Sequence, residues 1–522
     1  MSDIDRLGHV ADISRLHGRE RPDAVALDFQ DRLTTYGELD ERASRVANGL
    51  IGLAQQPGAR IGYIGRNCDR FWEVVLGAFK SRTATVTVNW RLAPPEMLFI
   101  LDDCDCEVLF VGGDFYGVVE ELRLSLPRLS TIVAMDGGHP EWPSYEAWRD
   151  AQDAADPALP NAPDDDIFQL YTSGTTGLPK GVCLTSANYL SLFQNPPVDV
   201  PAYTHDDVVL IAMPFFHVAG INMGMNTLAH GAGGVVLADV DVGEVLRLIP
   251  EKQISQALLV PAVILALTQH PKAADTDFSP LKRMAYGGSP IPEAVLSRAI
   301  ELMGCDFMQA YGLTETTGGP CTYLPPADHA PGRGKLRSCG VPAPGREVRV
   351  VDGEGRTLPP GEVGEIVVRA ACIMRGYWKR PEATAEAIRD GWFHTGDAGY
   401  FDGEGYLYIH DRVKEMIVSG GENTYPAEVE NALAAHPDIL DAAVIGVPDE
   451  KWGEAVKAIV VARPGAGLEA AGIIAFARRR IAGYKLPKSV DFVETIPRNP
   501  SGKILRRDLR KPYWEGRERQ VN

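Results

Sequence analysis

The chain has 522 residues, too many for one hydrophobic core, and a typical domain size of about 150 residues predicts three or four lobes. Hydrophobic residues make up 45% and charged residues 23% of the sequence, which is the balance of an ordinary globular protein. The net charge of −18 argues against nucleic acid as a main partner, because a phosphate backbone needs a basic surface.

The N-terminal segment and the cysteines predict a cytoplasmic protein. Residues 1–5 are acidic and carry no apolar core, so we expect no signal peptide. No run of 18 apolar residues occurs, so we expect no transmembrane segment, while peripheral membrane contact stays open. The eight cysteines include no Cys-x-x-Cys pair and no zinc-type spacing with histidine, which indicates reduced, mostly buried thiols.

Helix-type and strand-type patterns alternate over the early part of the chain. Thr35 is placed to cap a helix whose apolar stripe recurs every three or four residues, at Leu39, Ala43, Val46, Ala47 and Leu50. Short β-rich runs follow at 60–64, 84–88, 107–111 and 131–134. Strands separated by helices predict parallel sheets that are covered on both faces.

The pattern changes further along the chain. A surface connection over 153–166 precedes a second helix–strand series from 167 to about 320. Between 340 and 409, short strands punctuated by Gly and Pro predict a small β-barrel or meander. Two helix–strand cycles follow residue 411. We therefore expect an α/β fold whose large N-terminal domain has two parallel αβαβα-type sheets plus a small β-barrel, followed by a smaller α+β C-terminal domain.

The C-terminal tail is basic, unlike the rest of the chain. Residues 478–522 carry 13 Lys and Arg against five Asp and Glu. Such asymmetry is often only a solvated helix face, but it also suits an anionic ligand near this end.

The segment 171–181 has the composition of a phosphate-binding loop. It reads YTSGTTGLPKG and follows the apolar run 167–170. Glycines allow backbone N–H groups to turn inward, and the hydroxyl groups and the lysine add donors for phosphate oxygens. The segment lacks the Gly-x4-Gly-Lys-Ser/Thr pattern of P-loop NTPases, and such a loop taken alone is more often an ordinary turn.

Together with seven further motifs, this loop resembles the phosphate loop of the adenylate-forming (ANL) superfamily of acyl-CoA synthetases, adenylation domains and luciferases. The motifs follow the family's order over nearly the whole chain. They are MPFFH at 213–217, YGGSP at 286–290, QAYGLTE at 309–315, HTGD at 394–397, DRVK at 411–414, SGGEN at 419–423 and RNPSGK at 498–503. Residues 411–430 and the C-terminal end are most similar to bacterial medium- and long-chain fatty-acid–CoA ligases.

The resemblance implies an ATP-dependent acid–CoA ligase, with ATP, Mg²⁺ and coenzyme A as its ligands. A hydrophobic carboxylic acid, first of all a fatty acid, is activated as acyl-AMP with release of pyrophosphate, and the acyl group then passes to coenzyme A with release of AMP. The implied parts are an AMP-binding domain over 1–411, a hinge at 412–414 that contains Lys414, and a mobile C-terminal domain over 415–522.

The resemblance also assigns the adenylation chemistry to four side chains. Lys503 is the catalytic lysine, a compact charge that can reach between the carboxylate and the α-phosphate. Thr314 and Lys180 contact the phosphates. Glu315 is the expected Mg²⁺ ligand, in agreement with the preference of this ion for oxygen donors.

Further positions match the family's nucleotide site. Asp397 and Arg412 are expected to hold the ribose, and Tyr311 offers a flat ring to adenine. The remaining expected ATP contacts are Thr172, Ser173, Gly174, Thr175, Thr176, Gly177, Gly288, Ser289, Pro290, Ala310 and Gly312.

The acyl and CoA sites follow from the same resemblance. No Asp or Glu lies between Phe215 and Gly233, which disfavours an amino-acid substrate that would need a partner for its ammonium group. The expected acyl contacts are His217, Gly220, Ile221, Val260 and Gly287. The expected CoA contacts are Ser419, Gly420, Gly421, Trp452, Tyr484, Lys485 and Lys488.

Several alternatives stay open at this point. The acyl acceptor is either free CoA or the phosphopantetheine arm of a carrier protein, and an aryl or other hydrophobic acid competes with a fatty acid as substrate. A nucleotide-binding scaffold without activity and a luciferase-like oxidation have no distinctive residue in their favour. The sequence does not indicate the oligomeric state or the chain length of the acid.

Overall fold

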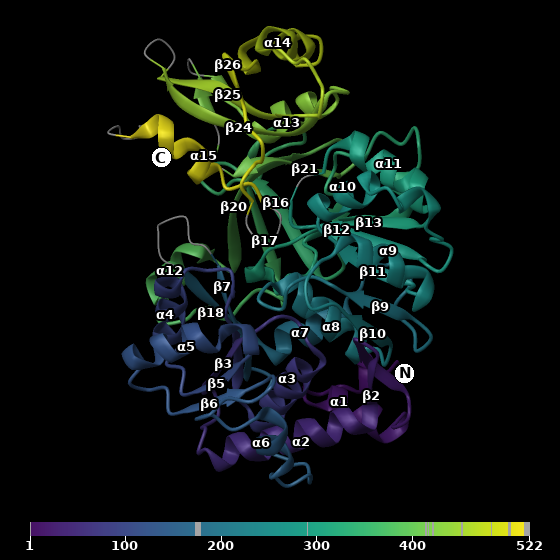
Figure 1. Cartoon of the computed structure of the whole chain (residues 1–522). Helices are drawn as coiled ribbons and strands as arrows, with labels where there is room; N and C mark the ends of the chain where they lie inside the picture. The colour runs from purple at the N-terminus through teal and green to yellow at the C-terminus, as the bar shows by residue number, and fades with distance from the viewer. Residues whose placement is uncertain are drawn as a thin grey trace.

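The computed structural model describes residues 2–172, 179–289, 291–412, 415, 417–419, 422–449, 453–481, 483–498 and 503–515. Three sheets lie in the large N-terminal part, and a fourth sheet forms a C-terminal lobe at the top of Figure 1. This arrangement confirms the predicted α/β fold with a large N-terminal domain and a smaller C-terminal one. Within the ranges given above, no helix is both long and apolar enough to cross a membrane.

The first sheet has seven strands in the order β18-β8-β7-β4-β3-β5-β6. They are β3 (Arg60–Ile64), β4 (Ala84–Thr87), β5 (Val108–Val111), β6 (Thr131–Ala134), β7 (Asp166–Thr172), β8 (Lys180–Thr185) and β18 (Gly376–Tyr377). The run from β7 to β6 is parallel, whereas β8 and β18 are added antiparallel. The four early strands predicted from the sequence are therefore present and parallel.

The second sheet has nine strands in the order β15-β14-β13-β12-β11-β9-β10-β1-β2. They are β1 (Val25–Phe29), β2 (Arg32–Thr35), β9 (Val208–Ile211), β10 (Gly233–Val236), β11 (Gln256–Leu259), β12 (Arg283–Gly287), β13 (Asp306–Tyr311), β14 (Thr322–Leu324) and β15 (Val341–Pro342). Its centre is parallel, and β2, β14 and β15 are antiparallel at the two edges.

The helices of the N-terminal part lie mostly between the strands of the first two sheets, as the sequence predicts. They are α1 (Asp12–Glu20), α2 (Tyr36–Gly52), α3 (Asp69–Ser81), α4 (Pro94–Asp103), α5 (Tyr116–Leu122), α6 (Tyr145–Asp150), α7 (Ser186–Gln194), α8 (Val218–Ala229), α9 (Val242–Glu251), α10 (Pro261–Gln269), α11 (Glu293–Met303) and α12 (Pro381–Ala387). Thr35 caps α2: its Oγ1 accepts from the backbone N–H of Glu38, and the Glu38 carboxylate accepts from the backbone N–H of Thr35. The predicted apolar stripe of α2 is buried.

Each of the first two sheets contains strands from both helix–strand series, which the sequence order did not predict. The hairpin β1–β2 joins the second sheet beside β10, while β7 and β8 complete the first sheet. Aromatic packing connects the two sheets, because Phe71 of α3 stacks on Phe215 with ring centroids 4.6 Å apart and Trp72 meets Phe215 edge-on at 5.3 Å. The two sheets therefore share one core and form a common platform.

The third sheet is antiparallel, in agreement with the meander expected between 340 and 409. Its strands are β16 (Arg346–Val351), β17 (Gly364–Ala370), β19 (Ile388–Arg389), β20 (Trp392–Phe401) and β21 (Leu407–Arg412). The order is β16-β17-β20-β19, and β21 pairs with β20.

The C-terminal lobe has its own core and a sheet of order β23-β22-β25-β24, with β26 parallel to β25. Its elements are β22 (Ile417–Ser419), β23 (Glu422–Thr424), α13 (Pro426–Ala434), β24 (Ile439–Asp449), β25 (Gly453–Ala462), α14 (Ala470–Arg478), β26 (Ser489–Phe492) and α15 (Arg506–Trp514). In Figure 1 this lobe lies above the third sheet, and α15 lies at the lower left of the lobe, beside the C-terminus.

Candidate active site

A cleft of about 3560 Å³ lies where the N-terminal sheets meet the C-terminal lobe. Residues from all four sheets or their connections line it. The expected site residues on its wall are Thr172, Lys180, His217, Val260, Gly287, Gly288, Ser289, Ala310, Tyr311, Gly312, Thr314, Glu315, Asp397 and Lys503. Side chains that are far apart in the sequence thus share one cavity.

The nucleotide motifs lie at the carboxyl ends of β12 and β13, which are parallel neighbours. Gly287 is the partner of Ala310 in their register, and a Cβ atom at Gly287 would come within 2.3 Å of the Ala310 carbonyl oxygen. Gly288 follows with a φ of +80°, which glycine adopts without strain. Glycines therefore let the two loops leave the sheet side by side, at the edge where open α/β sheets bind ligands.

The tyrosine of the second motif contacts the acid expected at the ribose. The hydroxyl of Tyr311 donates to Oδ2 of Asp397 at 2.8 Å, and both residues are buried. Burial, together with the charge of Asp397, raises the pKa of Tyr311 well above its ordinary value, so the phenol stays a donor. Asp397 on β20 is also the register partner of Arg412 on β21, which places both expected ribose residues on neighbouring strands.

Glu315 lies in a 3-10 turn, Thr314–Thr316, that follows β13. Its Oε1 accepts a 3.0 Å hydrogen bond from Tyr377, and its backbone oxygen accepts from Met374. The amino group of Lys180 lies 4.9 Å from the centroid of the Tyr377 ring. Tyr377 was missed from the sequence because no motif contains it, and its contact with Glu315 spans 62 positions.

Lys503 reaches the cleft from the C-terminal lobe, just before α15. The next anchor along the chain is Arg506, which is 7% exposed. Its guanidinium donates at 2.8 Å to Glu415 and to both oxygens of Glu430, and at 3.3 Å to the carbonyl of Val444. The segment that carries Lys503 is therefore tied to α13 and to the chain that follows the expected hinge.

His217 and Asn222 form the polar part of an otherwise apolar region of the cleft. Burial, and then the charge of Arg91, lower the pKa of His217 to about 4, so its ring is neutral at pH 7. Nδ2 of Asn222 donates to the Thr317 carbonyl at 2.9 Å. Within the described part of the chain, His217 Nε2 and Asn222 Oδ1 are buried and have no hydrogen-bond partner. Sequence reasoning missed Asn222, and an Asn on an apolar helix was the available signal.

Two of the expected acyl contacts do not line the cleft. Ile221 is fully buried in the main core. Gly220 packs against the backbone, where a Cβ atom would lie 2.3 Å from the carbonyl oxygen of Met213. The structure does not bring these two positions to the cleft wall, because α8 turns them toward the core while Val218 and Asn222 face the cavity.

The expected CoA residues are not gathered on the cleft. Ser419 is buried in the C-terminal lobe, while Tyr484 is exposed. Lys485 Nζ donates to both carboxylate oxygens of Glu428 at 2.7 Å, and Lys488 is exposed. The remaining expected residues Ser173, Gly174, Thr175, Thr176, Gly177, Pro290, Lys414, Gly420, Gly421 and Trp452, and the side chain of Arg412, lie outside the described residues.

The fold and the cleft define an enzyme that adenylates an acid at the junction of a large and a small domain. Residues 15–378 match the AMP-binding enzyme family, and residues 428–503 match the AMP-binding enzyme C-terminal domain. The chain belongs to this family of AMP-forming acid–thiol ligases, and the resemblance drawn from the motifs is confirmed.

Relatives and solved structures extend over almost the whole chain. A fatty acid–[acyl-carrier-protein] ligase, ScoC, from Streptomyces coeruleorubidus is 39% identical over 99% of this chain and 100% of its own length. A feruloyl-CoA synthase from an Amycolatopsis species is 38% identical over 95% of this chain and 97% of its own. The crystal structure of the anthranilate CoA ligase AuaEII with anthranoyl-AMP has a TM-score of 0.91 and 28% identity, and the match covers 98% of both chains.

Proposed function

We propose that this enzyme activates a hydrophobic carboxylic acid as acyl-AMP and then transfers the acyl group to coenzyme A. The observation that carries the proposal is the position of Lys503 from the C-terminal lobe, on the same cleft as Thr314, Glu315 and Asp397. The positive charge of Lys503 shares one cavity with the nucleotide motifs. This arrangement suits the adenylation step, in which two anionic groups react.

The first half-reaction joins two anions, so its barrier is largely electrostatic and positional. Lys503 would lie between the acid's carboxylate and the α-phosphate, and Thr314 would donate to that phosphate. Asp397 would accept from the ribose hydroxyls. Glu315, a carboxylate on the cleft, suits Mg²⁺, which would neutralise charge on the polyphosphate. The carboxylate oxygen then displaces pyrophosphate from the α-phosphorus, giving the acyl-adenylate.

The second half-reaction would use a different face of the C-terminal domain. We take residues 1–411 as the AMP-binding domain, 412–414 as the hinge and 415–522 as the domain that rotates. The thiol sulfur attacks the acyl carbonyl carbon, and the bond between that carbon and the phosphate oxygen breaks. AMP leaves with the electron pair of that bond, and the thiol proton passes to solvent. The basic tail supports CoA as acceptor, although Lys485 would have to exchange Glu428 for a phosphate. A carrier-protein arm is the alternative acceptor.

A fatty acid is the first candidate substrate, because the region near His217 is lined by apolar groups such as Val218 and Val260. A specific observation favours a second candidate. Asn222 lines the cleft, its buried Oδ1 has no hydrogen-bond partner among the described residues, and a buried acceptor is costly unless a donor reaches it. A hydrophobic acid with its own donor, such as a hydroxylated aryl acid, would satisfy that oxygen.

Pyrophosphate release with ATP, Mg²⁺ and a panel of acids tests the activation step. The panel should contain saturated fatty acids and hydroxylated aryl acids of matched size. Acids that give pyrophosphate release are then incubated with CoA or with a phosphopantetheinylated carrier protein, and the thioester is identified by mass spectrometry. Release of pyrophosphate without any CoA thioester would refute CoA as the acceptor, and no release with any acid would refute the adenylation proposal.

A further inference from the structure

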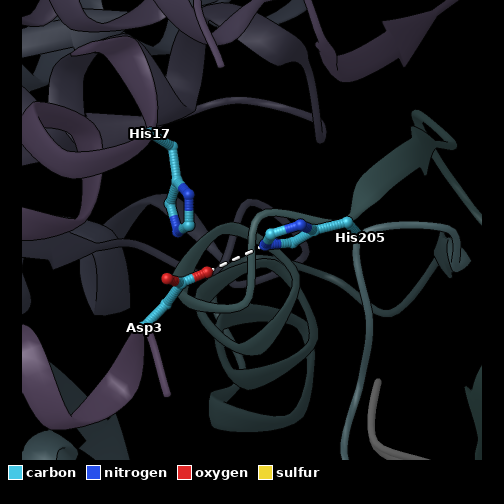
Figure 2. Close-up of side chains that lie close together, drawn as sticks. All are labelled: Asp3, His17 and His205. Atoms are coloured by element: carbon cyan, nitrogen blue, oxygen red, sulfur yellow. Dashed lines mark hydrogen bonds and ion pairs between the residues drawn. The ribbon is translucent and has the colours of Figure 1, made fainter. Parts of the chain in front are cut away.

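Three side chains from distant parts of the chain converge away from the cleft. Asp3 precedes the first 3-10 turn, His17 lies on α1, and His205 lies in the connection before β9. Figure 2 shows the three side chains pointing toward one another, and one potential ligand atom of each lies within 4.8 Å of the others. None of the three lines the active-site cleft, so the cluster is separate from the proposed chemistry.

Two short polar contacts orient the cluster. Nε2 of His205 donates to Oδ2 of Asp3 at 2.8 Å, and Nε2 of His17 lies 3.1 Å from the carbonyl oxygen of Ala229. Neighbouring donor atoms on one tetrahedral cation are about 3.3–3.6 Å apart when the metal–ligand bonds are about 2.0–2.2 Å long, only slightly more than these contacts. A cation could therefore take the place of the two shared protons with small side-chain movements.

The exposures of the three side chains suit a metal ligand set. His17 is 1% exposed, whereas the side chains of Asp3 and His205 are 24% and 45% exposed, which leaves an entry path for an ion. Positive charge also faces the cluster, since Arg6 pairs with Oδ1 of Asp3 at 3.5 Å and Arg21 lies near His17.

We propose that Asp3, His17 and His205 form a structural binding site for a divalent transition-metal ion. Two imidazole nitrogens and a carboxylate oxygen are typical ligands of Zn²⁺, whereas Mg²⁺ and Ca²⁺ prefer oxygen ligands throughout. The carbonyl oxygen of Ala229, at the end of α8, lies beside His17 and is a further oxygen donor near the cluster. The bound ion fastens the N-terminal segment to α1 and to the connection before β9, and thereby stabilises the folded chain.

Zinc binding to the full-length protein, after treatment with a chelator and its removal, tests the site. Calorimetric titration with zinc chloride should show saturable binding, and the Tm should rise with the zinc concentration because only the folded chain holds the three ligands together. His205→Gln and Asp3→Asn alter exposed or half-exposed positions, and each should weaken the binding at least about tenfold. MgCl₂ should not reproduce the rise in Tm.

A matched control and a spectrum complete the test. His436→Gln removes a half-exposed histidine of the C-terminal lobe, outside the cluster, and should leave zinc affinity unchanged. Co²⁺ bound at the site should give visible absorption bands in the wild type that His205→Gln removes, while adenylation stays at the wild-type rate. The proposal is overturned if zinc does not bind, or if both cluster variants bind zinc as tightly as the wild type.

Discussion

The hydroxyl group of Tyr377 donates a 3.0 Å hydrogen bond to Glu315, and the amino group of Lys180 lies 4.9 Å from the centroid of the same tyrosine ring. One aromatic side chain therefore contacts both the expected Mg²⁺ ligand and an expected phosphate contact. All three residues line the cleft. The pairing of β18 with β8 brings Tyr377 to the strand that begins at Lys180.

Tyr377→Phe should lower kcat/KM for ATP about tenfold, because a hydrogen bond to a charged group contributes about 1.5 kcal/mol or more. The ring beneath Lys180 is retained in this variant, so the hydroxyl is tested by itself. Tyr377→Leu removes the ring as well and should cost a further few-fold, in line with about 0.5–1 kcal/mol for the cation–π contact. Steady-state rates of pyrophosphate release at varied ATP and fixed Mg²⁺ provide the measurement. Wild-type kinetics in Tyr377→Phe would show that the contact does not position Glu315.

Lys503→Ala should abolish most acyl-adenylate formation yet spare thioester formation from supplied acyl-adenylate. The reason is that the ammonium group is needed only where two anions meet, and a lost electrostatic contact of this kind costs on the order of 10²–10³ in rate. Single-turnover assays of the two half-reactions separate the effects. Lys503→Arg keeps the charge but changes its shape and should recover only part of the rate. An equal loss in both half-reactions would contradict the assignment.

Asn222→Leu should change the preference between two kinds of acid. A substrate hydroxyl or amino group would lose its acceptor, so kcat/KM for a donor-bearing aryl acid should fall about tenfold relative to that for a plain alkyl acid. The measurement is the ratio of the two kcat/KM values, because a loss of enzyme stability in the variant would lower both values by the same factor. Asn226→Leu, one turn along α8 and not on the cleft wall, is the matched control. An unchanged ratio would remove the argument for an aryl substrate.

Most of the correct predictions from the sequence came from local hydrophobic patterns and from short linear motifs. The cap at Thr35 and the apolar stripe beginning at Leu39 depend on neighbours within one or two helical turns, and both are present. The motif residues could be assigned because each stands in a short, ordered string. Contacts across the fold were beyond this reasoning, since nothing near Tyr377 in the sequence points to Glu315.

Helix orientation explains why Gly220 and Ile221 do not line the cleft. The MPFFH motif precedes α8 and lies beside the cleft, but it does not indicate which face of α8 looks into the cavity. Successive helical residues turn by about 100°, so Val218 and Asn222, four positions apart, share the cleft face. Ile221 then points to the core. The exchange of β1 and β2 into the second sheet was missed for a related reason, because strand order is set by packing and not by sequence order.

Stability should fall as the pH drops from 6.5 toward 4, in part because of a buried histidine. Burial lowers the pKa of His9 from 6.5 to about 4 in the folded chain, and the residue is 4% exposed. In this window the unfolded chain binds a proton that the folded chain does not, so the free energy of unfolding decreases by about 1.4 kcal/mol per pH unit for this group. His9→Asn keeps an acceptor for the Ala11 N–H and should flatten the slope by that amount. Guanidinium unfolding between pH 4 and 8 measures it, and parallel curves for both proteins would contradict the prediction.

Arg506→Met should loosen the segment that carries Lys503. Removing the guanidinium leaves Glu415 and Glu430 without the charge that pairs with both, and breaking a buried ion pair from one side typically costs about 3–5 kcal/mol. The loss should appear as a lower denaturant midpoint of the C-terminal domain and as a fall in the adenylation rate. Arg507→Met removes the same charge from an exposed neighbour on α15 and should leave the unfolding midpoint close to that of the wild type. Hydrogen exchange of the α15 amides tells the two variants apart: faster exchange in Arg506→Met alone is expected, and equal exchange in both would mean that Arg506 does not anchor the Lys503 segment.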